Sequence, residues 1–285
     1  MVKIALPNKG RLADDTRALL EDAGLGIRVQ SDRALMATLG DEFQAIFVRS
    51  QDIPEFVADG AADAGVTGWD LVSESERELT DRLDLGFGRC RIVVAARDDS
   101  GIETLADIRP GIRVATVFPR VARRFFERMG RPVELVPVSG ATETAPHLGI
   151  ADVIVDIVST GSTLKMNGLR EVATILDSSA RLVTNPRCAA DTRSALDRLA
   201  IRLESVVRAR GQRYVMANVP RDALARIRDV VPGINGPTVI DIMNEGRHVA
   251  VHAVVAAGAI DRTIADLKSL GAEGILVTRI ERLMP

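Results

Sequence analysis

Residues 153–164 combine the residue types that bind a phosphorylated sugar. An apolar run, 153–155, leads to Asp156, and a loop of hydroxyl side chains around Gly161 follows. Gly161 lets the backbone approach an anion, while N–H groups and hydroxyls can donate to phosphate oxygens. A carboxylate before such a loop suits ribose hydroxyls or a magnesium ion. The pattern predicts a phosphoribosyl diphosphate site, although the same residues could simply cap a helix. The residues are Asp156, Ser159, Thr160, Gly161, Ser162, Thr163 and Leu164.

Basic residues occupy loops after other predicted strands. Residues 2–6 form an apolar run that is followed by Lys9, Gly10 and Arg11. Lys9 is one of four lysines in the chain, and a lysine there could hold a polyphosphate as a compact point charge. Arg49 and Asp70 stand in similar strand-end loops, although a surface ion pair would account for either residue alone. Because such loops face the cleft of an open α/β sheet, we expect a shared site.

Two similar strand–helix patterns must position these residues. The strand at 2–6 is followed by a helix that Gly24 ends, and a strand at 112–116 is followed by a helix over 121–129. Each pattern leads to a similar phrase, residues 60–66 and 149–155. Alternating strands and helices predict parallel sheets. The repetition favours an α/β fold of two similar lobes around a cleft, with a chance recurrence of the pattern as the alternative.

Two segments are expected to cross between the lobes. Residues 85–96 indicate one crossing strand and residues 171–184 a second, after which a helix over 191–210 returns the chain. Two crossings make the first lobe discontinuous and form a hinge. The predicted limits are 1–90 with 178–210 for the first lobe and 91–177 for the second.

The last 75 residues show a different order of elements. The patterns predict strands at 213–219, 238–243, 248–256 and 274–280, with helices at 221–231 and 261–270. That order is βαββαβ, typical of a ferredoxin-like domain, which we place at 211–285. Small-molecule regulatory domains often have this form, but the fold alone does not give the function.

Composition excludes several classes of protein. The formal net charge is −2 and aromatic residues make up 3%, so we expect no nucleic-acid partner. Two cysteines and three histidines without metal-ligand spacing argue against zinc and against a disulfide framework. No apolar stretch is long enough to span a membrane, and residues 1–7 lack the apolar region of a signal peptide. We therefore expect a cytoplasmic protein without a membrane partner.

The phosphate-loop region also fits a longer signature with fixed spacing. The matching residues are Glu143, Gly149, Ala151, Ile154, Asp156, Ile157, Thr160, Gly161, Thr163 and Leu164. With this signature the chain resembles the ATP phosphoribosyltransferase family in its long form. Further phrases at 7–12, 66–71, 176–182 and 271–277 extend the resemblance over essentially the whole chain.

The resemblance implies a fold and an activity. The fold would be two lobes like those of periplasmic binding proteins, which form the catalytic cleft, followed by a histidine-binding regulatory domain at 211–285. The activity would join phosphoribosyl diphosphate to N1 of ATP with release of pyrophosphate, with Mg²⁺ as cofactor and histidine as inhibitor. The resemblance also implies a homo-oligomer, either a dimer or a hexamer. The rival interpretations are a bilobal binding or sensor protein without catalysis, and a degenerate member retained as a histidine sensor.

The resemblance also suggests roles for single residues. Asp156 and Glu143 would act on the ribose as the catalytic pair, and the loop 160–163 would hold the 5-phosphate. The ATP-binding residues would be Lys9, Gly10, Arg11, Arg49 and Asp70. The histidine contacts would be Thr238, Gly271, Ala272 and Ile275. The metal ligands stay unassigned.

Overall fold

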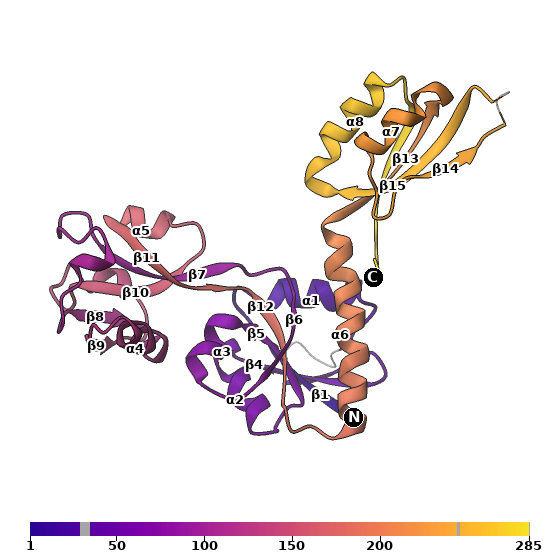
Figure 1. Cartoon of the computed structure of the whole chain (residues 1–285). Helices are drawn as coiled ribbons and strands as arrows, with labels where there is room; N and C mark the ends of the chain where they lie inside the picture. Colours follow the sequence, from indigo (N-terminus) through magenta and orange to yellow (C-terminus); the bar gives the residue numbers. More distant parts are fainter. Residues whose placement is uncertain (29–34, 244–245, 285) are drawn as a thin grey trace. The chain divides into compact units, whose positions relative to one another are not determined.

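The computed structural model describes residues 1–28, 35–243 and 246–284 (Figure 1). The chain forms two compact units, Met1–Ala200 and Ile201–Pro285. The limit between them falls inside the long helix α6, Ala190–Arg210, whereas the sequence-based limit at residue 211 follows the end of that helix.

The first lobe is built on a seven-stranded sheet in the order β2-β3-β4-β1-β5-β12-β6. Its central strand β1 is parallel to β4 and β5, and its residues Ile4, Ala5 and Leu6 are buried, as expected for a strand covered on both faces. Helices α1, α2 and α3 contact this sheet (Figure 1). The bounds are β1 Val2–Pro7, α1 Ala13–Asp22, β2 Ile27–Arg28, β3 Met36–Leu39, β4 Phe43–Val48, α2 Ile53–Ala58, β5 Ala64–Gly68, α3 Trp69–Ser75, β6 Thr80–Asp84 and β12 Ala180–Thr184.

The second lobe has a five-stranded sheet in the order β11-β7-β10-β8-β9. The helix α4 packs against it through Val121, Ala122 and Phe126, which join Ile92 and Val155 in one apolar core. The bounds are β7 Cys90–Arg97, β8 Arg113–Thr116, α4 Pro119–Arg128, β9 Glu134–Pro137, β10 Val153–Val158, α5 Ser162–Met166 and β11 Leu169–Ser178.

The two lobes repeat one topology and one polar contact. The order β4-β1-β5-β12 in the first sheet corresponds to β9-β8-β10-β7 in the second, with the last strand antiparallel in each. The carboxylate of Asp63 accepts the Lys3 N–H at 2.8 Å, and its own N–H donates to the Lys3 carbonyl. Asp152 makes the same two contacts with Arg113, each at 2.9 Å. The predicted α/β fold of two similar lobes is confirmed.

The crossings between the sheets are shorter strands than the sequence suggested. The expected strand at 85–96 begins only at Cys90, because Gly86 and Gly88 adopt φ values of +77° and +62° that break an extended chain. The second crossing is divided into β11 and β12, which separate at Ser179.

The unit Ile201–Pro285 contains a four-stranded antiparallel sheet in the order β14-β15-β13-β16, with α7 and α8 packed against it. The order of elements is βαββαβ, so the predicted ferredoxin-like domain is confirmed. The core is aliphatic and includes Val219, Ile227 and Leu267. None of the helices in the described residues combines the length and the hydrophobicity of a transmembrane span. The bounds are β13 Gln212–Pro220, α7 Leu224–Val230, β14 Thr238–Asp241, β15 His248–Ala256, α8 Ile260–Ser269 and β16 Glu273–Arg279.

Candidate functional site

The sequence-predicted residues of the second lobe gather at the carboxyl end of β10. A pocket of about 190 Å³ opens there. Ser162 does not line it; this residue begins α5, and its hydroxyl is hydrogen-bonded to that of Thr160 at 2.9 Å. Gly161 has φ +80°, a value that glycine adopts without strain, so the loop can turn tightly under a bound anion. The pocket is lined by Glu143, Asp156, Ile157, Val158, Ser159, Thr160, Gly161, Thr163 and Leu164.

Asp156 is the partly buried carboxylate of this pocket. Burial raises the pKa of Asp156 above its ordinary value, and the nearby charge of Glu143 raises it further. The Ile157 N–H, which donates to Oδ1 at 2.7 Å, and the Thr142 hydroxyl act in the opposite direction but do not outweigh burial. Oγ1 of Thr142 is itself buried and makes no hydrogen bond within the described residues. The pocket therefore holds a poorly solvated acceptor that hydroxyl donors would stabilise.

Glu143 reaches the pocket from an unusual backbone turn. It lies in the short 3₁₀ helix Thr142–Thr144, which follows Ala141 at φ +50°. A positive φ on a residue with a Cβ costs on the order of 1 kcal/mol, and residues strained in this way cluster at functional sites. The Thr144 hydroxyl donates to the Ala141 carbonyl at 2.8 Å and holds the turn. This local strain is an independent sign that the position of Glu143 matters.

The sequence-predicted residues of the first lobe share the equivalent edge of their sheet. Lys9 and Gly10 follow β1 and are exposed, and Arg49 follows the neighbouring strand β4. The Thr67 hydroxyl donates to the Ser50 carbonyl at 2.8 Å, which fixes the loop after β4 to the end of β5. Within the part of the chain that the structure describes, the Lys9 and Arg49 side chains make no hydrogen bond or ion pair. Both cations are thus free to bind an anion.

Arg11 and Asp70 are arranged differently from Lys9 and Arg49. The Asp70 side chain is only 3% exposed, and one of its carboxylate oxygens lies 3.7 Å from the Arg11 guanidinium. The same oxygen accepts the Ser178 hydroxyl at 2.6 Å. Arg11 also donates to the Gly88 carbonyl and to Sγ of Cys90. These side chains face each other and the crossing segments.

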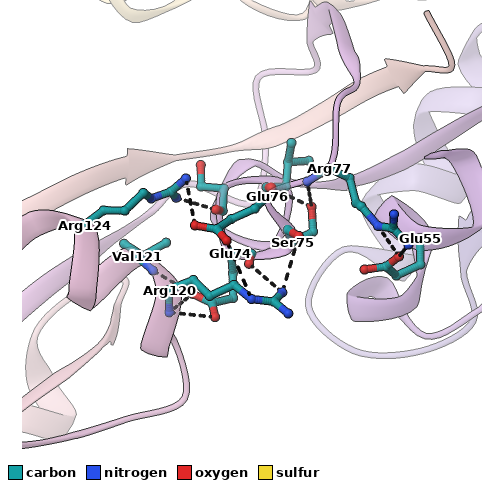
Figure 2. A network of polar contacts seen from close by, with 10 residues as sticks. Glu55, Glu74, Ser75, Glu76, Arg77, Arg120, Val121 and Arg124 are labelled. Atoms are coloured by element: carbon teal, nitrogen blue, oxygen red, sulfur yellow. Dashed lines mark hydrogen bonds and ion pairs between the residues drawn. The ribbon is translucent and has the colours of Figure 1, made fainter. Parts of the chain in front are cut away.

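A second polar network joins the two lobes directly. The Glu74 carboxylate, near the end of α3, accepts the N–H groups of Arg120 and Val121 at 2.9–3.1 Å and so caps the start of α4 (Figure 2). The Arg120 guanidinium returns to the carbonyls of Glu74 and Ser75, and Arg124 bonds the Ser73 carbonyl. Both arginines also pair with Glu76. The lobes are therefore connected by a polar contact in addition to the two crossings.

A magnesium ion fits only as a partner of a bound phosphate. The described residues contain no group of three or more His, Cys, Asp or Glu side chains arranged around a metal position. Asp156 and Glu143 do line one pocket, and Mg²⁺ in proteins is commonly held by one or two carboxylates together with substrate phosphates and water. The donor set therefore fits a metal that arrives with a diphosphate.

The residues expected to contact histidine are not brought together within one copy of the C-terminal sheet. Thr238 lies on edge strand β14 opposite His252, whereas Gly271 and Ala272 precede the other edge strand, β16, which contains Ile275. Two strands, β15 and β13, separate these edges.

Comparisons with known proteins identify the family. The family model of ATP phosphoribosyltransferase matches residues 49–205, and the model of the HisG C-terminal domain matches residues 209–282. The chain belongs to the ATP phosphoribosyltransferase family. An ATP phosphoribosyltransferase of Gemmatimonas aurantiaca is 66% identical over 292 residues and covers the full length of both chains. One of Natronomonas pharaonis is 47% identical, again over the full length of both.

A solved structure agrees with this membership. The ATP phosphoribosyl transferase (HisG:HisZ) complex of Thermotoga maritima matches with 31% identity and a TM-score of 0.65, over 73% of this chain and 99% of that chain. The ATP phosphoribosyltransferase resemblance inferred from the signature is confirmed, including the long form with its C-terminal domain. A bilobal binding or sensor protein is not favoured.

Three residues of this ATP phosphoribosyltransferase that contact the predicted residues or join the lobes were not predicted from the sequence. Ser178 and Cys90 lie at the crossings and contact the Asp70–Arg11 pair, and Glu74 caps a helix of the other lobe. Ser178 lies in the motif at residues 176–182, which is part of the resemblance to the family, so the sequence could have indicated its importance. Glu74 and Cys90 stand in ordinary helix and strand patterns that offer none.

Proposed function

We propose that this protein transfers the phosphoribosyl group of phosphoribosyl diphosphate to N1 of ATP, giving N1-(5-phosphoribosyl)-ATP and pyrophosphate, in the first step of histidine biosynthesis. The observation that carries this proposal is the pocket at the end of β10, where two carboxylates meet a loop of hydroxyl and N–H donors. A 5-phosphate would bind the loop 160–163. The ribose hydroxyls would bind Asp156 and Glu143.

The reaction requires the protein to position the two substrates and does not require a general base. Adenine N1 carries a free lone pair at neutral pH, so it can attack C1 of the ribose without prior deprotonation. As the bond to the diphosphate breaks, positive charge develops on the ribose ring, and the Asp156 and Glu143 carboxylates stabilise that charge electrostatically. The loop 160–163 orients the sugar by its phosphate, which lowers the entropic cost of the encounter.

ATP would bind at the edge of the first lobe. Lys9 and Arg49 are exposed cations without a partner in the described part of the chain, which suits contact with the triphosphate. Gly10, at φ +88°, gives the loop a turn in which a backbone N–H can approach a phosphate. Arg11 and Asp70 would fix this loop, because their side chains bind each other.

Magnesium is proposed as a cofactor that enters with phosphoribosyl diphosphate. Asp156 and Glu143 would hold it together with the diphosphate oxygens. When bound, the ion would neutralise the charge that accumulates on the departing pyrophosphate.

The C-terminal unit would bind histidine as an inhibitor. The expected contacts Thr238, Gly271, Ala272 and Ile275 lie at opposite edges of the sheet, so a site that contains all of them requires a second copy of the chain. This supports the expected homo-oligomer, a dimer or a hexamer. The mode of action would be a coupling between distant sites. Cytoplasmic localisation is proposed with the biosynthetic role.

One experiment tests the activity. The protein is mixed with ATP, phosphoribosyl diphosphate and Mg²⁺, and released pyrophosphate is followed while the nucleotide product is weighed by mass spectrometry. The expected result is one pyrophosphate per adduct of ATP with a phosphoribosyl group, and no product with Asp156→Ala. If both substrates bind but neither is consumed, the binding or sensor interpretation replaces the enzyme.

A further inference from the structure

Three distant segments of the first unit meet at the carboxylate of Asp70. Asp70 lies in the first turn of α3, Arg11 lies in the loop after β1, and Ser178 is the last residue of the crossing strand β11. Asp70 and Ser178 are 2% and 5% exposed. A buried charge is tolerated only where hydrogen bonds or an opposite charge stabilise it, so the partners of Asp70 define what it does.

Ser178 holds Asp70 by two hydrogen bonds at once. Its hydroxyl donates to the Asp70 carboxylate at 2.6 Å and accepts the Asp70 backbone N–H at 2.9 Å. Gly68 leaves the space that the carboxylate occupies, since a Cβ at Gly68 would lie 2.2 Å from its Oδ1. The side chain of Asp70 therefore has one supported orientation, and Ser178 supplies it from the crossing strand.

Arg11 is the cation that this arrangement orients. Its guanidinium lies 3.7 Å from the Asp70 carboxylate and donates to the Gly88 carbonyl and, at 3.2 Å, to Sγ of Cys90. Gly88 and Cys90 belong to the first crossing and Ser178 to the second. Arg11 immediately follows Lys9 and Gly10, so its anchoring fixes the loop that carries the free cation Lys9.

We propose that Ser178 is a positioning residue that, through Asp70, fixes Arg11 and the Lys9 loop in the geometry that binds the phosphates of ATP. The proposal rests on the proposed function for the identity of the ligand. It divides the basic residues at this edge into two classes: Lys9 and Arg49 contact the nucleotide, whereas Arg11 is held by the hinge. It also links the ATP side of the cleft to both crossings.

The test compares two neighbouring serines. Ser178→Ala removes the hydroxyl that binds Asp70, and Ser179→Ala removes an equally buried hydroxyl that binds Asp84 at 2.8 Å. The equilibrium affinity for ATP is measured by titration calorimetry, and initial rates give KM for each substrate. We expect Ser178→Ala to raise the Kd and KM for ATP about tenfold, which corresponds to about 1.4 kcal/mol, with KM for phosphoribosyl diphosphate and kcat within about twofold. Ser179→Ala should leave all of these values within about twofold.

Two further variants keep the test decisive. Ser178→Thr retains the hydroxyl and should keep the ATP affinity of the wild type. Asp70→Asn retains the shape of the side chain but removes the charge that orients Arg11. Asp70→Asn should therefore weaken ATP binding as Ser178→Ala does. Asp70→Asn also provides the measurement if Ser178→Ala does not fold. An unchanged ATP affinity in the folded variants, or an equal loss in Ser179→Ala, would overturn the proposal. The affinity for ATP is measured without turnover. If the protein binds ATP but forms no product, the proposed function is refuted, and the comparison of ATP affinities still tests the role of Ser178.

Discussion

Asp156 and Glu143 line the same pocket, and the charge of Glu143 adds to the burial that raises the pKa of Asp156. Two carboxylates in one small pocket repel each other unless a cation or hydroxyl donors lie between them. The folded protein therefore carries an unfavourable interaction that bound substrate would relieve. Sites built for function commonly have this property, and replacement of such a residue stabilises the fold while it removes activity.

The first prediction concerns the stability of Asp156→Asn. The pKa of Asp156 is higher in the folded than in the unfolded state, so ionisation disfavours folding as the pH rises through the folded pKa. Asn keeps an oxygen that can accept the Ile157 N–H but carries no charge. We expect a higher Tm than the wild type at pH 7, a difference that disappears below the unfolded pKa of 3.8, and loss of transferase activity.

Asp152→Asn is a control of opposite sign. Burial alone would raise the pKa of Asp152, but the Arg113 N–H and guanidinium outweigh burial and lower it. Asp152 therefore stabilises the fold above its unfolded pKa, and this contribution is lost as the pH falls through the folded pKa. Asp152→Asn should lower the Tm at pH 7 and leave KM for ATP and for phosphoribosyl diphosphate unchanged. Thermal unfolding of both variants is followed by circular dichroism from pH 3 to pH 8. If Asp156→Asn has a lower Tm than the wild type at pH 7, the raised pKa of Asp156 in the folded state is contradicted.

The second prediction concerns Lys9. Lys9→Met keeps the length of the side chain and removes the charge from the loop after β1. A lost contact between an ammonium group and a phosphate should raise KM for ATP at least about tenfold, since hydrogen bonds to charged groups contribute about 1.5–3 kcal/mol. Lys3→Met is the matched control, because Lys3 is also exposed and lies near the other end of β1. Steady-state kinetics should show an unchanged KM for ATP in Lys3→Met. If KM for ATP rises equally in both variants, the effect comes from the general loss of positive charge and not from a contact between Lys9 and ATP.

The third prediction concerns the polar contact between the lobes. Glu74→Gln removes the negative charge from the start of α4, where a carboxylate contributes about 0.3–1 kcal/mol. We expect the lobes to sample a wider range of orientations, measured as a broader distance distribution between spin labels on the two lobes. Arg77→Gln is the control, because Arg77 pairs with Glu55 (Figure 2) and with Asp59, both in its own lobe. If Arg77→Gln broadens the distribution as much as Glu74→Gln, the contact with α4 does not hold the lobes.

The local parts of the molecule were predictable from the sequence. The runs at residues 2–6 and 153–155 indicate strands, and their residues 4–6 and 153–155 are buried. The βαββαβ order follows from periodicity and turn residues. The turn at Gly161 was also predictable, because the glycine and its hydroxyl-bearing neighbours act within one turn of chain, whereas its binding of a phosphate stays a prediction. Each of these features depends on neighbours in the sequence.

The parts that could not be predicted depend on residues far apart in the chain. Ser178 reaches Asp70 across 108 positions, and Glu74 reaches Arg120 across 46. Sequence types alone cannot tell that Arg11 binds a carboxylate whereas Arg49 is free, since both are arginines in strand-end loops. The buried Asp70 carboxylate next to Arg11 makes the difference, and its position there is a property of the assembled sheets.

The last prediction concerns the proposed inhibition by histidine. Thr238→Val removes a hydroxyl from edge strand β14, and we expect it to weaken inhibition while KM for both substrates stays within about twofold, because the residue lies outside the catalytic lobes. Thr278→Val is the control, since Thr278 is an exposed threonine on another strand of the same sheet. Inhibition curves for the two variants and the wild type provide the measurement.

Mixing of variants decides whether a histidine site spans two copies. Ala272→Leu adds volume next to Gly271, at the edge opposite Thr238, and should also weaken inhibition. If each site takes Thr238 from one copy and Ala272 from another, subunits exchanged between the Thr238→Val and Ala272→Leu proteins will form some sites with both native residues. We therefore expect inhibition to return in part when the two variants are mixed and allowed to reassemble. Mass spectrometry verifies that the subunits have exchanged. If inhibition does not recover after verified exchange, a site that spans two copies is contradicted, because a site within one chain would stay defective in every subunit.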